Sequence, residues 1–338
     1  DLILVTNASY AINTVLCSWA WQANDEILVS NQEYSHYWAL LRRIAKTTGA
    51  VIKVAQLPLA TETHSPTPAQ IVESIERCLS PRTRALFISH VTSPVGLALP
   101  VRELCALARK HGITSIVDGA HAPGMVDVDL RAIDPDFYAA NLHKWMMGSP
   151  GAAFLYAKHE HRLRIEPLMT FANYEFDSEH VDWRPNPQTP TNWAMSHEYQ
   201  GTRDLGAFAA IPALLGYRES LGYTRVTARS RTLRSYAAMC FAAHDWQIVS
   251  PNHQELATAM LTLAIPGVTA GQFDVVAAWQ DFREKHQIEI AFPLISGEAH
   301  ALLRLSTAWF NTESEIDQFV KIATTTDFQR YSTLRTRT

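Results

Sequence analysis

Short apolar segments that alternate with helix-like segments restrict the possible folds of this chain more than any other feature. The apolar segments lie at residues 26–30, 51–57, 85–91, 113–119, 136–141 and 151–157. In the intervening segment VRELCALARKHG, apolar residues recur at helical spacing from Val101 to Ala108, and Gly112 can end that helix. The alternation predicts an α/β fold in which helices cover both faces of a mostly parallel sheet.

The pattern changes after residue 170. Residues 171–197 are rich in proline, asparagine and aromatic residues, and we predict a functional or interfacial loop there. A helical stretch from about Leu205 to Leu221 follows, and the remainder mixes helices with strand-like segments such as IEIAFPLI and ALLRLST. We therefore expect a large domain over residues 1–215 and a smaller α+β domain over residues 216–338.

Charge and cysteine usage exclude several classes of function. The net charge is −4 without a long basic run, so we expect neither a nucleic-acid nor a membrane partner. The four cysteines are scattered without a CxxC pair, which favours a cytoplasmic protein without a metal site. The chain begins at Asp1 and enters the strand-like LILVT at once, so we expect that an N-terminal segment is missing.

Lys144 lies in NLHKWMMGSPG, directly after the apolar run DFYAAN. A lysine with bulky apolar neighbours usually lays its stem on the protein surface and keeps its ammonium group in water. The alternative is a partly desolvated amine, whose pKa falls so that it can condense with an aldehyde. The residues around Lys144 in the fold must decide between these two interpretations.

Candidate binding residues follow the predicted strands at the points where the strands end. They are Asn7, Ala8 and Ser9 after LILVT, Tyr34 after EILVS, Ser93 after ALFISHV, Asp118 and His121 after ITSIV, and His143 and Lys144 after DFYAAN. Each has an ordinary explanation, such as a helix cap for Ser9 or a turn for Asp118. However, open α/β sheets bind ligands at this edge, so we expect these side chains to converge on one site.

Taken together, these residues match the needs of pyridoxal phosphate. The helix that starts near Ser9 offers N–H groups to a phosphate, and Tyr34 offers an aromatic face. Asp118 is a carboxylate that can keep the ring nitrogen protonated, so that the ring withdraws electrons from a carbanion. A dinucleotide is disfavoured because no GxGxxG motif follows these strands.

Seven segments between Asp1 and about Phe319 carry a family resemblance. They are TNASYAINTVL, NQEY, HVTSPVGLALPV, VDGAHAPG, NLHKWMMGSPGAAFLY, YQGTRD and LLRLSTAWFNTESEID. With them the sequence resembles the class V aminotransferases, which are pyridoxal-phosphate enzymes of fold type I, and within these the isopenicillin N epimerase-like branch. The resemblance implies a large domain with a mostly parallel sheet of the seven-stranded type, a smaller C-terminal α+β domain, and a dimer.

The resemblance also implies roles for individual residues. Lys144 would be the Schiff-base lysine, Asp118 the partner of the pyridine nitrogen, and His121 a donor to the ring hydroxyl. The remaining implied cofactor contacts are Ala8, Ser9 and His143 at the phosphate, Tyr34 stacked on the ring, Ser93 near the ring hydroxyl, and Gly201 and Thr202 at the phosphate of the neighbouring subunit. The last two imply a homodimer with shared active sites.

Arg304 interrupts the strand-like ALLRLST, where a guanidinium is costly to bury without an anion. A substrate carboxylate would satisfy it with two hydrogen bonds, and a structural ion pair is the alternative. Thr312 and Glu315 have the spacing of a capping box that starts the next helix.

The resemblance implies epimerase-like action at the α-carbon of an amino acid or peptide-like substrate. A carbon–sulfur lyase, an aminotransferase and a pyridoxal-phosphate-binding pseudoenzyme are the alternatives. Desulfuration with a mobile catalytic cysteine is set aside, because IEIAFPLISGEAH before Arg304 contains no cysteine. The residues leave the substrate and the second proton donor of an epimerase open.

Overall fold

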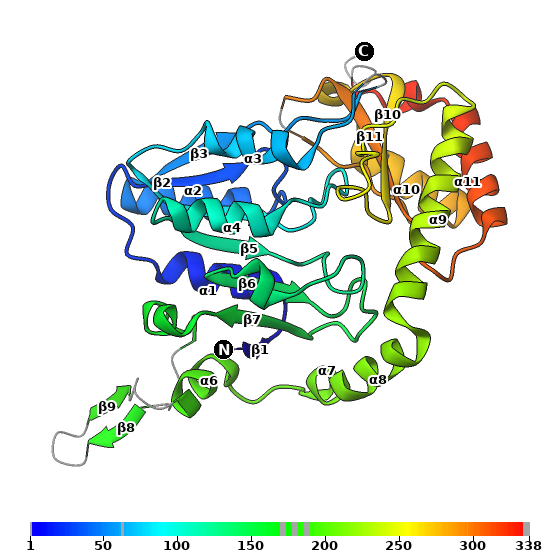
Figure 1. Ribbon diagram of the computed structural model, residues 1–338. Coiled ribbons are helices and arrows are strands. Elements are labelled where there is room, and N and C mark those ends of the chain that lie inside the picture. The colour runs from blue at the N-terminus through cyan, green and yellow to red at the C-terminus, as the bar shows by residue number, and fades with distance from the viewer. Residues whose placement is uncertain are drawn as a thin grey trace.

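A seven-stranded sheet lies at the centre of the computed structural model, which describes residues 2–61, 64–169, 174–177, 182–185, 190–295 and 297–333. Its strands are β1 (Leu2–Val5), β2 (Glu26–Ser30), β3 (Val51–Ala55), β4 (Thr83–Ser89), β5 (Thr114–Asp118), β6 (Phe137–Asn141) and β7 (Ala153–Ala157). The order across the sheet is β1-β7-β6-β5-β4-β2-β3, and β7 runs antiparallel to the other six strands (Figure 1). The predicted mostly parallel sheet is confirmed.

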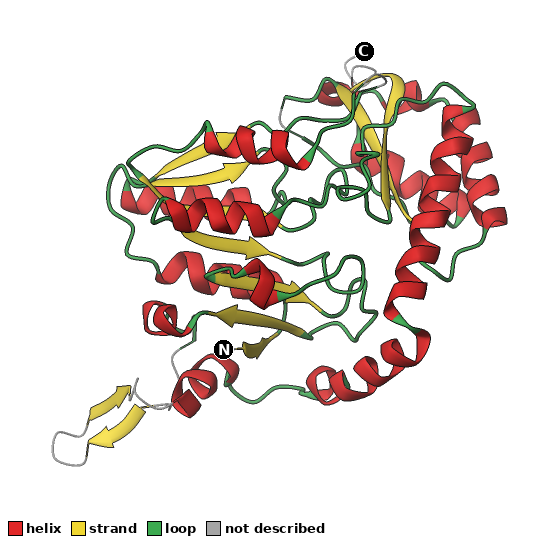
Figure 2. Ribbon diagram, in the orientation of Figure 1, coloured by secondary structure: helices red, strands yellow, loops and turns green. Residues whose placement is uncertain are grey.

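Both faces of the central strands of this sheet are buried, which explains why their middle residues are apolar, whereas the edge strand β3 is only partly buried. Ile27 and Val29 pack in a core cluster with helices α1 (Ala8–Ser18) and α2 (Tyr37–Thr48). Leu28 packs in a second cluster with α3 (Pro68–Glu76) and α4 (Val101–Lys110). Successive strand residues point to opposite faces, so both sets must be apolar. Figure 2 distinguishes the helices from the strands between them.

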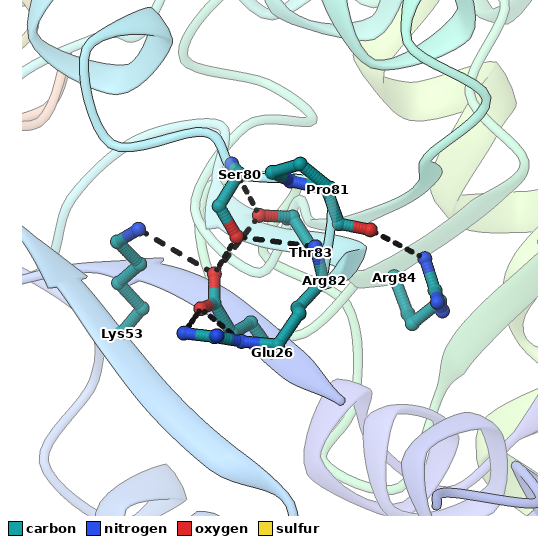
Figure 3. A network of polar contacts seen from close by, with 7 residues as sticks. All are labelled: Glu26, Lys53, Ser80, Pro81, Arg82, Thr83 and Arg84. Atoms are coloured by element: carbon teal, nitrogen blue, oxygen red, sulfur yellow. Dashed lines mark hydrogen bonds and ion pairs between the residues drawn. The ribbon is translucent and has the colours of Figure 1, made fainter. Parts of the chain in front are cut away.

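A buried carboxylate ties three strands together at the end opposite their carboxyl termini (Figure 3). Glu26, the first residue of β2, accepts hydrogen bonds from Ser80 Oγ at 2.6 Å and from Arg82 Nη2 at 2.9 Å, and Lys53 Nζ of β3 lies 3.4 Å away. Burial raises the pKa of Glu26, but these hydrogen bonds and the Lys53 ammonium outweigh it, so the net pKa is lowered. The carboxylate is therefore a structural group.

The C-terminal part of the chain has its own apolar cluster. It contains α9 (Tyr223–Ala242), β10 (Met260–Thr269), α10 (Val275–His286), β11 (His300–Ser306) and α11 (Glu313–Thr325), with β10 and β11 paired antiparallel. Phe241, Phe282 and Phe319 pack among these elements. The capping box of α11 is confirmed, because Thr312 Oγ1 accepts from the Glu315 N–H at 3.2 Å and Glu315 Oε2 accepts from the Thr312 N–H at 2.8 Å.

The prediction of a strand at IEIAFPLI is wrong. Residues 288–295 contain only an isolated bridge between Ala291 and Arg304 of β11. Pro293 has no N–H group to donate to a strand ladder, which works against a continuous strand here. The other segment predicted in this part, ALLRLST, forms β11.

The connection between the two parts is largely helical. It contains β8 (Tyr174–Asp177), β9 (Asp182–Pro185), α6 (Pro190–Glu198), α7 (Gly206–Ala209) and α8 (Ile211–Leu221). The loop predicted at 171–197 is wrong where the structure describes it, because those residues form β8, β9 and most of α6; residues 171–173, 178–181 and 186–189 lie outside the described residues. The helix α8 continues through residue 215, and Val249 and Leu302 pack in the same cluster as Leu28, so the division at 215 stays a prediction.

Short helical elements complete the fold. They are α5 (Leu130–Ile133) and the 3-10 turns His159–Arg164, Ala270–Gln272 and Phe328–Tyr331. Within the described ranges, no helix is both long enough and apolar enough to span a membrane.

Candidate active site

A cavity lies at the carboxyl ends of the central strands. Its lining includes eight residues that the sequence predicted, namely Asn7, Ser9, Tyr34, Ser93, Asp118, His121, His143 and Lys144. Tyr37, Ser89, Val91, Ala120 and Asn141 complete it. The structure therefore brings together side chains that are separated by up to 137 positions, from Asn7 to Lys144, as expected at this edge of an open α/β sheet.

Lys144 points its amine into this cavity. Its Nζ lies 3.0 Å from Nε2 of His121 and 5.8 Å from the centre of the Tyr34 ring. Burial lowers the pKa of Lys144, the Asp118 carboxylate opposes this effect, and the Arg304 guanidinium lowers the pKa further. The amine is thus partly desolvated, which is the state that the second interpretation of Lys144 requires.

Asp118 is a buried carboxylate at the end of β5, with only 4% of its surface exposed. Its Oδ1 accepts a hydrogen bond from the Ala120 N–H at 2.9 Å, and the Tyr37 hydroxyl also hydrogen-bonds to it. Burial raises the pKa of Asp118, while Lys144 and these hydrogen bonds lower it in part, so the net pKa is raised. A carboxylate placed in this way is stabilised by a cation entering the cavity.

The N-terminus of α1 forms one wall. Asn7 caps the helix by accepting from the Tyr10 N–H at 2.7 Å, and the Ala8 N–H donates to Asn141 Oδ1 at 2.8 Å. Of the two predicted contacts here, Ser9 lines the cavity, whereas the N–H of Ala8 is already bonded. The positive end of the helix dipole still favours an anion at this wall.

His143 supplies a further polar atom. Its Nδ1 is buried and has no hydrogen-bond partner among the described residues. Burial lowers the pKa of His143. A buried ring nitrogen without a partner is costly, and a ligand that reaches it would remove this cost.

Arg304 approaches the same region from β11. Its Nη1 donates to the backbone oxygen of Ser93 and lies 3.2 Å from Ser93 Oγ, while its buried Nε has no partner among the described residues. Within those residues no carboxylate pairs with Arg304, so the geometry favours the anion-binding interpretation over a structural ion pair.

Gly201 and Thr202 do not line the cavity of this chain. They lie in the segment between α6 and α7, where Thr202 is exposed to solvent. The structure of one chain therefore does not bring them to the site.

Sequence reasoning missed Glu33, which is 3% exposed and stands directly before Tyr34. Its two carboxyl oxygens accept hydrogen bonds from Ser30 Oγ and Ser89 Oγ, each at 2.6 Å. Burial raises the pKa of Glu33 to about 7, and the nearby Asp118 contributes to the rise. The only sequence signal was its place in the segment NQEY, three residues after the end of β2.

Tyr37 and Asn141 were missed as well. Tyr37 is the first residue of α2 and is 2% exposed, and Asn141 is the last residue of β6. Tyr37 supports Asp118, and Asn141 holds the start of α1 through Ala8. Both contacts join segments that are distant in sequence, so no local pattern could have revealed them.

Comparisons of the sequence and of the structure with known proteins identify the family. A family model described as aminotransferase class V matches residues 1–319. The chain is 33% identical over 323 residues to an isopenicillin N epimerase of Amycolatopsis lactamdurans. The matched region covers 95% of this chain and 79% of that protein. The chain is also 26% identical over 332 residues to a probable cysteine desulfurase of Xylella fastidiosa strain 9a5c. The matched region covers 95% of this chain and 74% of that protein.

The chain belongs to the class V aminotransferase family. A solved structure of a cystine C–S lyase, in complex with its product cysteine persulfide, shares the fold. The two structures superpose with a TM-score of 0.78 at 19% sequence identity, and the superposition covers 97% of this chain and 81% of the lyase chain. Class V aminotransferases of this kind are pyridoxal-phosphate enzymes of fold type I, as the sequence predicted.

The cavity fits the cofactor of the class V family on three observations. Asp118 is a buried carboxylate that a protonated ring nitrogen would neutralise. His143 Nδ1 lacks a partner among the described residues, and Ser9 stands at a helix N-terminus, so both suit a phosphate. Lys144 is an amine of lowered pKa beside them.

A glycine of the VDGAHAPG segment places Lys144, and this yields a prediction. Gly124 has a φ of +85°, and a Cβ there would lie 2.6 Å from the carbonyl oxygen of Trp145. Gly124→Ala should therefore destabilise the protein by about 2–3 kcal/mol, because left-handed strain adds to a backbone clash. Gly112→Ala is the control, since its φ is +65° but nothing lies within 4 Å.

Urea unfolding of the two variants measures the difference. We expect Gly112→Ala to lose about 1 kcal/mol, the cost of the left-handed backbone alone. Equal losses in both variants would show that the contact between Gly124 and Trp145 does not hold this segment in place.

Proposed function

We propose that this chain moves the α-proton of an amino acid or peptide-like substrate and inverts the α-carbon, as an epimerase does. The observation that carries the proposal is the convergence of Lys144, Asp118 and His121 in one cavity, with Arg304 nearby, whose buried Nε has no partner among the described residues. The similarity to an isopenicillin N epimerase supports inversion as the outcome.

Each residue has a proposed part in this reaction. Arg304 would bind the substrate carboxylate, and the Lys144 amine would take the α-proton. Pyridoxal phosphate, when bound, withdraws electrons from the α-carbon through its ring. Asp118 keeps a proton on the ring nitrogen, and His121 donates to the ring hydroxyl.

The remaining proposed contacts hold the cofactor in place. They are Ala8, Ser9 and His143 at the phosphate, Tyr34 on the ring face, Ser93 near the ring hydroxyl, and Gly201 and Thr202 at the phosphate of a neighbouring subunit. Because the Ala8 N–H bonds to Asn141 Oδ1, a contact from Ala8 requires that Asn141 turn away.

Inversion requires a second proton donor on the face opposite Lys144, and we assign this role to Tyr34. Its ring lies 5.8 Å from the amine across the same cavity. Tyr34→Phe should keep the exchange of the α-proton but slow the appearance of the opposite enantiomer by about 10²-fold or more, because one proton donor is lost.

Incubation of one enantiomer in heavy water tests both the function and the role of Tyr34. The proposal predicts the opposite enantiomer with deuterium at the α-carbon. A keto acid with aminated cofactor would establish an aminotransferase, a released thiol with a keto acid would establish a carbon–sulfur lyase, and no exchange on any amino acid of a panel would indicate a pseudoenzyme. Equal inversion by Tyr34→Phe would remove Tyr34 from its role.

We further propose that the protein is a homodimer with shared active sites. Thr202 is exposed and outside the cavity of its own chain, so a contact with a phosphate must be made in another subunit. Large apolar side chains are also exposed around this segment, among them Leu205 at 56% and Tyr217 at 52%. Exposed apolar patches of this kind are typical of subunit interfaces.

Mixing two inactive variants tests the shared site. Lys144→Ala and Thr202→Ala chains, refolded together, should form mixed dimers in which one of the two sites carries neither substitution. Since half of the dimers are then mixed, activity should return to about a quarter of the wild-type value. A mixture no more active than the Thr202→Ala protein alone would place the Thr202 contact within one chain.

We also propose a cytoplasmic location. The described cysteines Cys17, Cys78, Cys105 and Cys240 are all free thiols. Free thiols without disulfides are typical of a reducing compartment.

A further inference from the structure

Trp145, the residue after Lys144, makes a contact that the proposed function does not use. Its indole Nε1–H donates to Nδ1 of His121 at 3.3 Å, and His121 Nε2 lies 3.0 Å from Lys144 Nζ. The imidazole therefore stands between the indole and the amine, with one ring nitrogen directed at each.

The chemistry of the indole decides which nitrogen of His121 carries the proton. An indole N–H is a donor only, so Nδ1 must present its lone pair to Trp145. A neutral imidazole has one N–H group, which must then be on Nε2. A doubly protonated ring is excluded by the same contact, because two N–H groups would face each other. Burial and the positive charges of Lys144 and Arg304 also lower the pKa of His121 well below its usual value.

The proton on Nε2 in turn decides the state of the amine. An ammonium group has three donors and no lone pair, so it cannot accept the hydrogen bond that Nε2–H directs at Nζ. A neutral amine can accept it. Of the other charged groups around Lys144, Asp118 favours the ammonium, whereas Arg304 and burial disfavour it, and Tyr34 contributes only its ring face.

We propose that Trp145 is a positioning residue that fixes the Nε2–H tautomer of His121 and thereby holds Lys144 as a neutral, nucleophilic amine that is ready to bind the cofactor. The proposal rests on the role given to Lys144 in the proposed function. With the cofactor bound, the same tautomer would leave the His121 Nε2–H free to donate to the ring hydroxyl, which is the role that the proposed function gives to His121.

The packing of Trp145 suits such a role. Trp145 packs against the buried cluster of Val91, Ala98, Met125 and Met260, and its backbone carbonyl carbon would be 2.7 Å from a Cβ at Gly124. The side chain is thus supported on the apolar side while its N–H reaches His121. A purely apolar function for this residue is the alternative that the experiment must separate.

Trp145→Phe removes the N–H and keeps most of the apolar surface. The measurement is the rate at which the cofactor-free chain takes up pyridoxal phosphate on Lys144, followed by absorbance as a function of pH. Without the indole, His121 can present a bare Nε2 to an ammonium, which favours the charged amine. We expect the pH midpoint to rise by about one unit, so that uptake below the midpoint slows about tenfold.

The matched control is Trp279→Phe, because Trp279 also donates through its indole, to Glu289 Oε1 at 2.7 Å, but in the C-terminal part of the chain. It should leave the profile unchanged. A Trp145→Phe profile with an unshifted midpoint, whether as fast as the wild type or slower by one factor at every pH, overturns the proposal and leaves Trp145 a packing residue. Cofactor attachment at a residue other than Lys144 would instead overturn the proposed function.

A measurement on the wild-type chain keeps the proposal testable if Trp145→Phe does not fold. Nitrogen NMR of the cofactor-free protein with labelled histidine reports which ring nitrogen is protonated, and His121→Gln identifies the signal among the 14 histidines. The proposal predicts a bare Nδ1 and a protonated Nε2 in His121. A proton on Nδ1 would overturn it.

Discussion

Replacing Lys144 with alanine should abolish exchange of the substrate α-proton with solvent deuterium. Lys144 is the described amine that lines the cavity, so its replacement removes both the proposed base and the amine that would bind the cofactor. Loss of a positioned base alone costs about 10²–10⁴-fold in rate, and the loss of the covalent attachment point adds to this. Deuterium incorporation into the substrate, followed by NMR or mass spectrometry, measures the effect.

Lys158→Ala is the control for this substitution. Lys158 is also a partly buried lysine, but it pairs with Asp134 at 2.7 Å and Asp136 at 3.6 Å, away from the cavity. It should retain wild-type exchange. Exchange by the Lys144→Ala protein at a rate near that of the Lys158→Ala protein would show that another group is the base.

Replacing Asp118 with asparagine should slow α-proton exchange by about 10²–10³-fold, the range found when one preorganised charge is removed from an active site. Asparagine keeps the shape and can still accept from the Ala120 N–H through its side-chain oxygen. It cannot neutralise a protonated ring nitrogen, so the cofactor should stay bound but lose most of its electron withdrawal.

The fold of the Asp118→Asn protein should be intact. Burial raises the pKa of Asp118, which means that the buried charge is unfavourable in the folded state. Removing this charge should therefore cost little stability. Asp136→Asn is the control, because Asp136 bonds to the Ser115 N–H at 2.8 Å and does not line the cavity. Unchanged exchange in the Asp118 variant would exclude it as the partner of the ring nitrogen.

The central sheet could be predicted because its strands are buried on both faces. Each apolar segment assigned to it overlaps a strand, since a strand covered on both faces needs apolar residues on both of them. The failure at residues 288–295 has the same origin. IEIAFPLI is apolar because it packs on the C-terminal cluster through Ile290 and Phe292, and burial alone does not make a strand.

The candidate site was predictable where function depends on the ends of strands. Asp118, His143 and Lys144 follow β5 and β6 directly, so parallel pairing brings them to one edge. Glu33 and Trp145 act through contacts that tertiary packing creates. Ser89 reaches Glu33 across 56 positions, and Trp145 meets His121 across 24, and neither separation has a local signature.

Hydride reduction of the holoenzyme tests the central claim most directly, because it converts the link between pyridoxal phosphate and its lysine into a stable bond. After digestion, mass spectrometry should find the pyridoxyl group on the peptide that contains Lys144, and fragmentation should place it on that residue. The Lys144→Ala protein, treated in the same way, should carry no label. A label on any other lysine, or an unlabelled wild-type protein after loading with cofactor, would contradict the assignment of Lys144 as the reactive amine of this site.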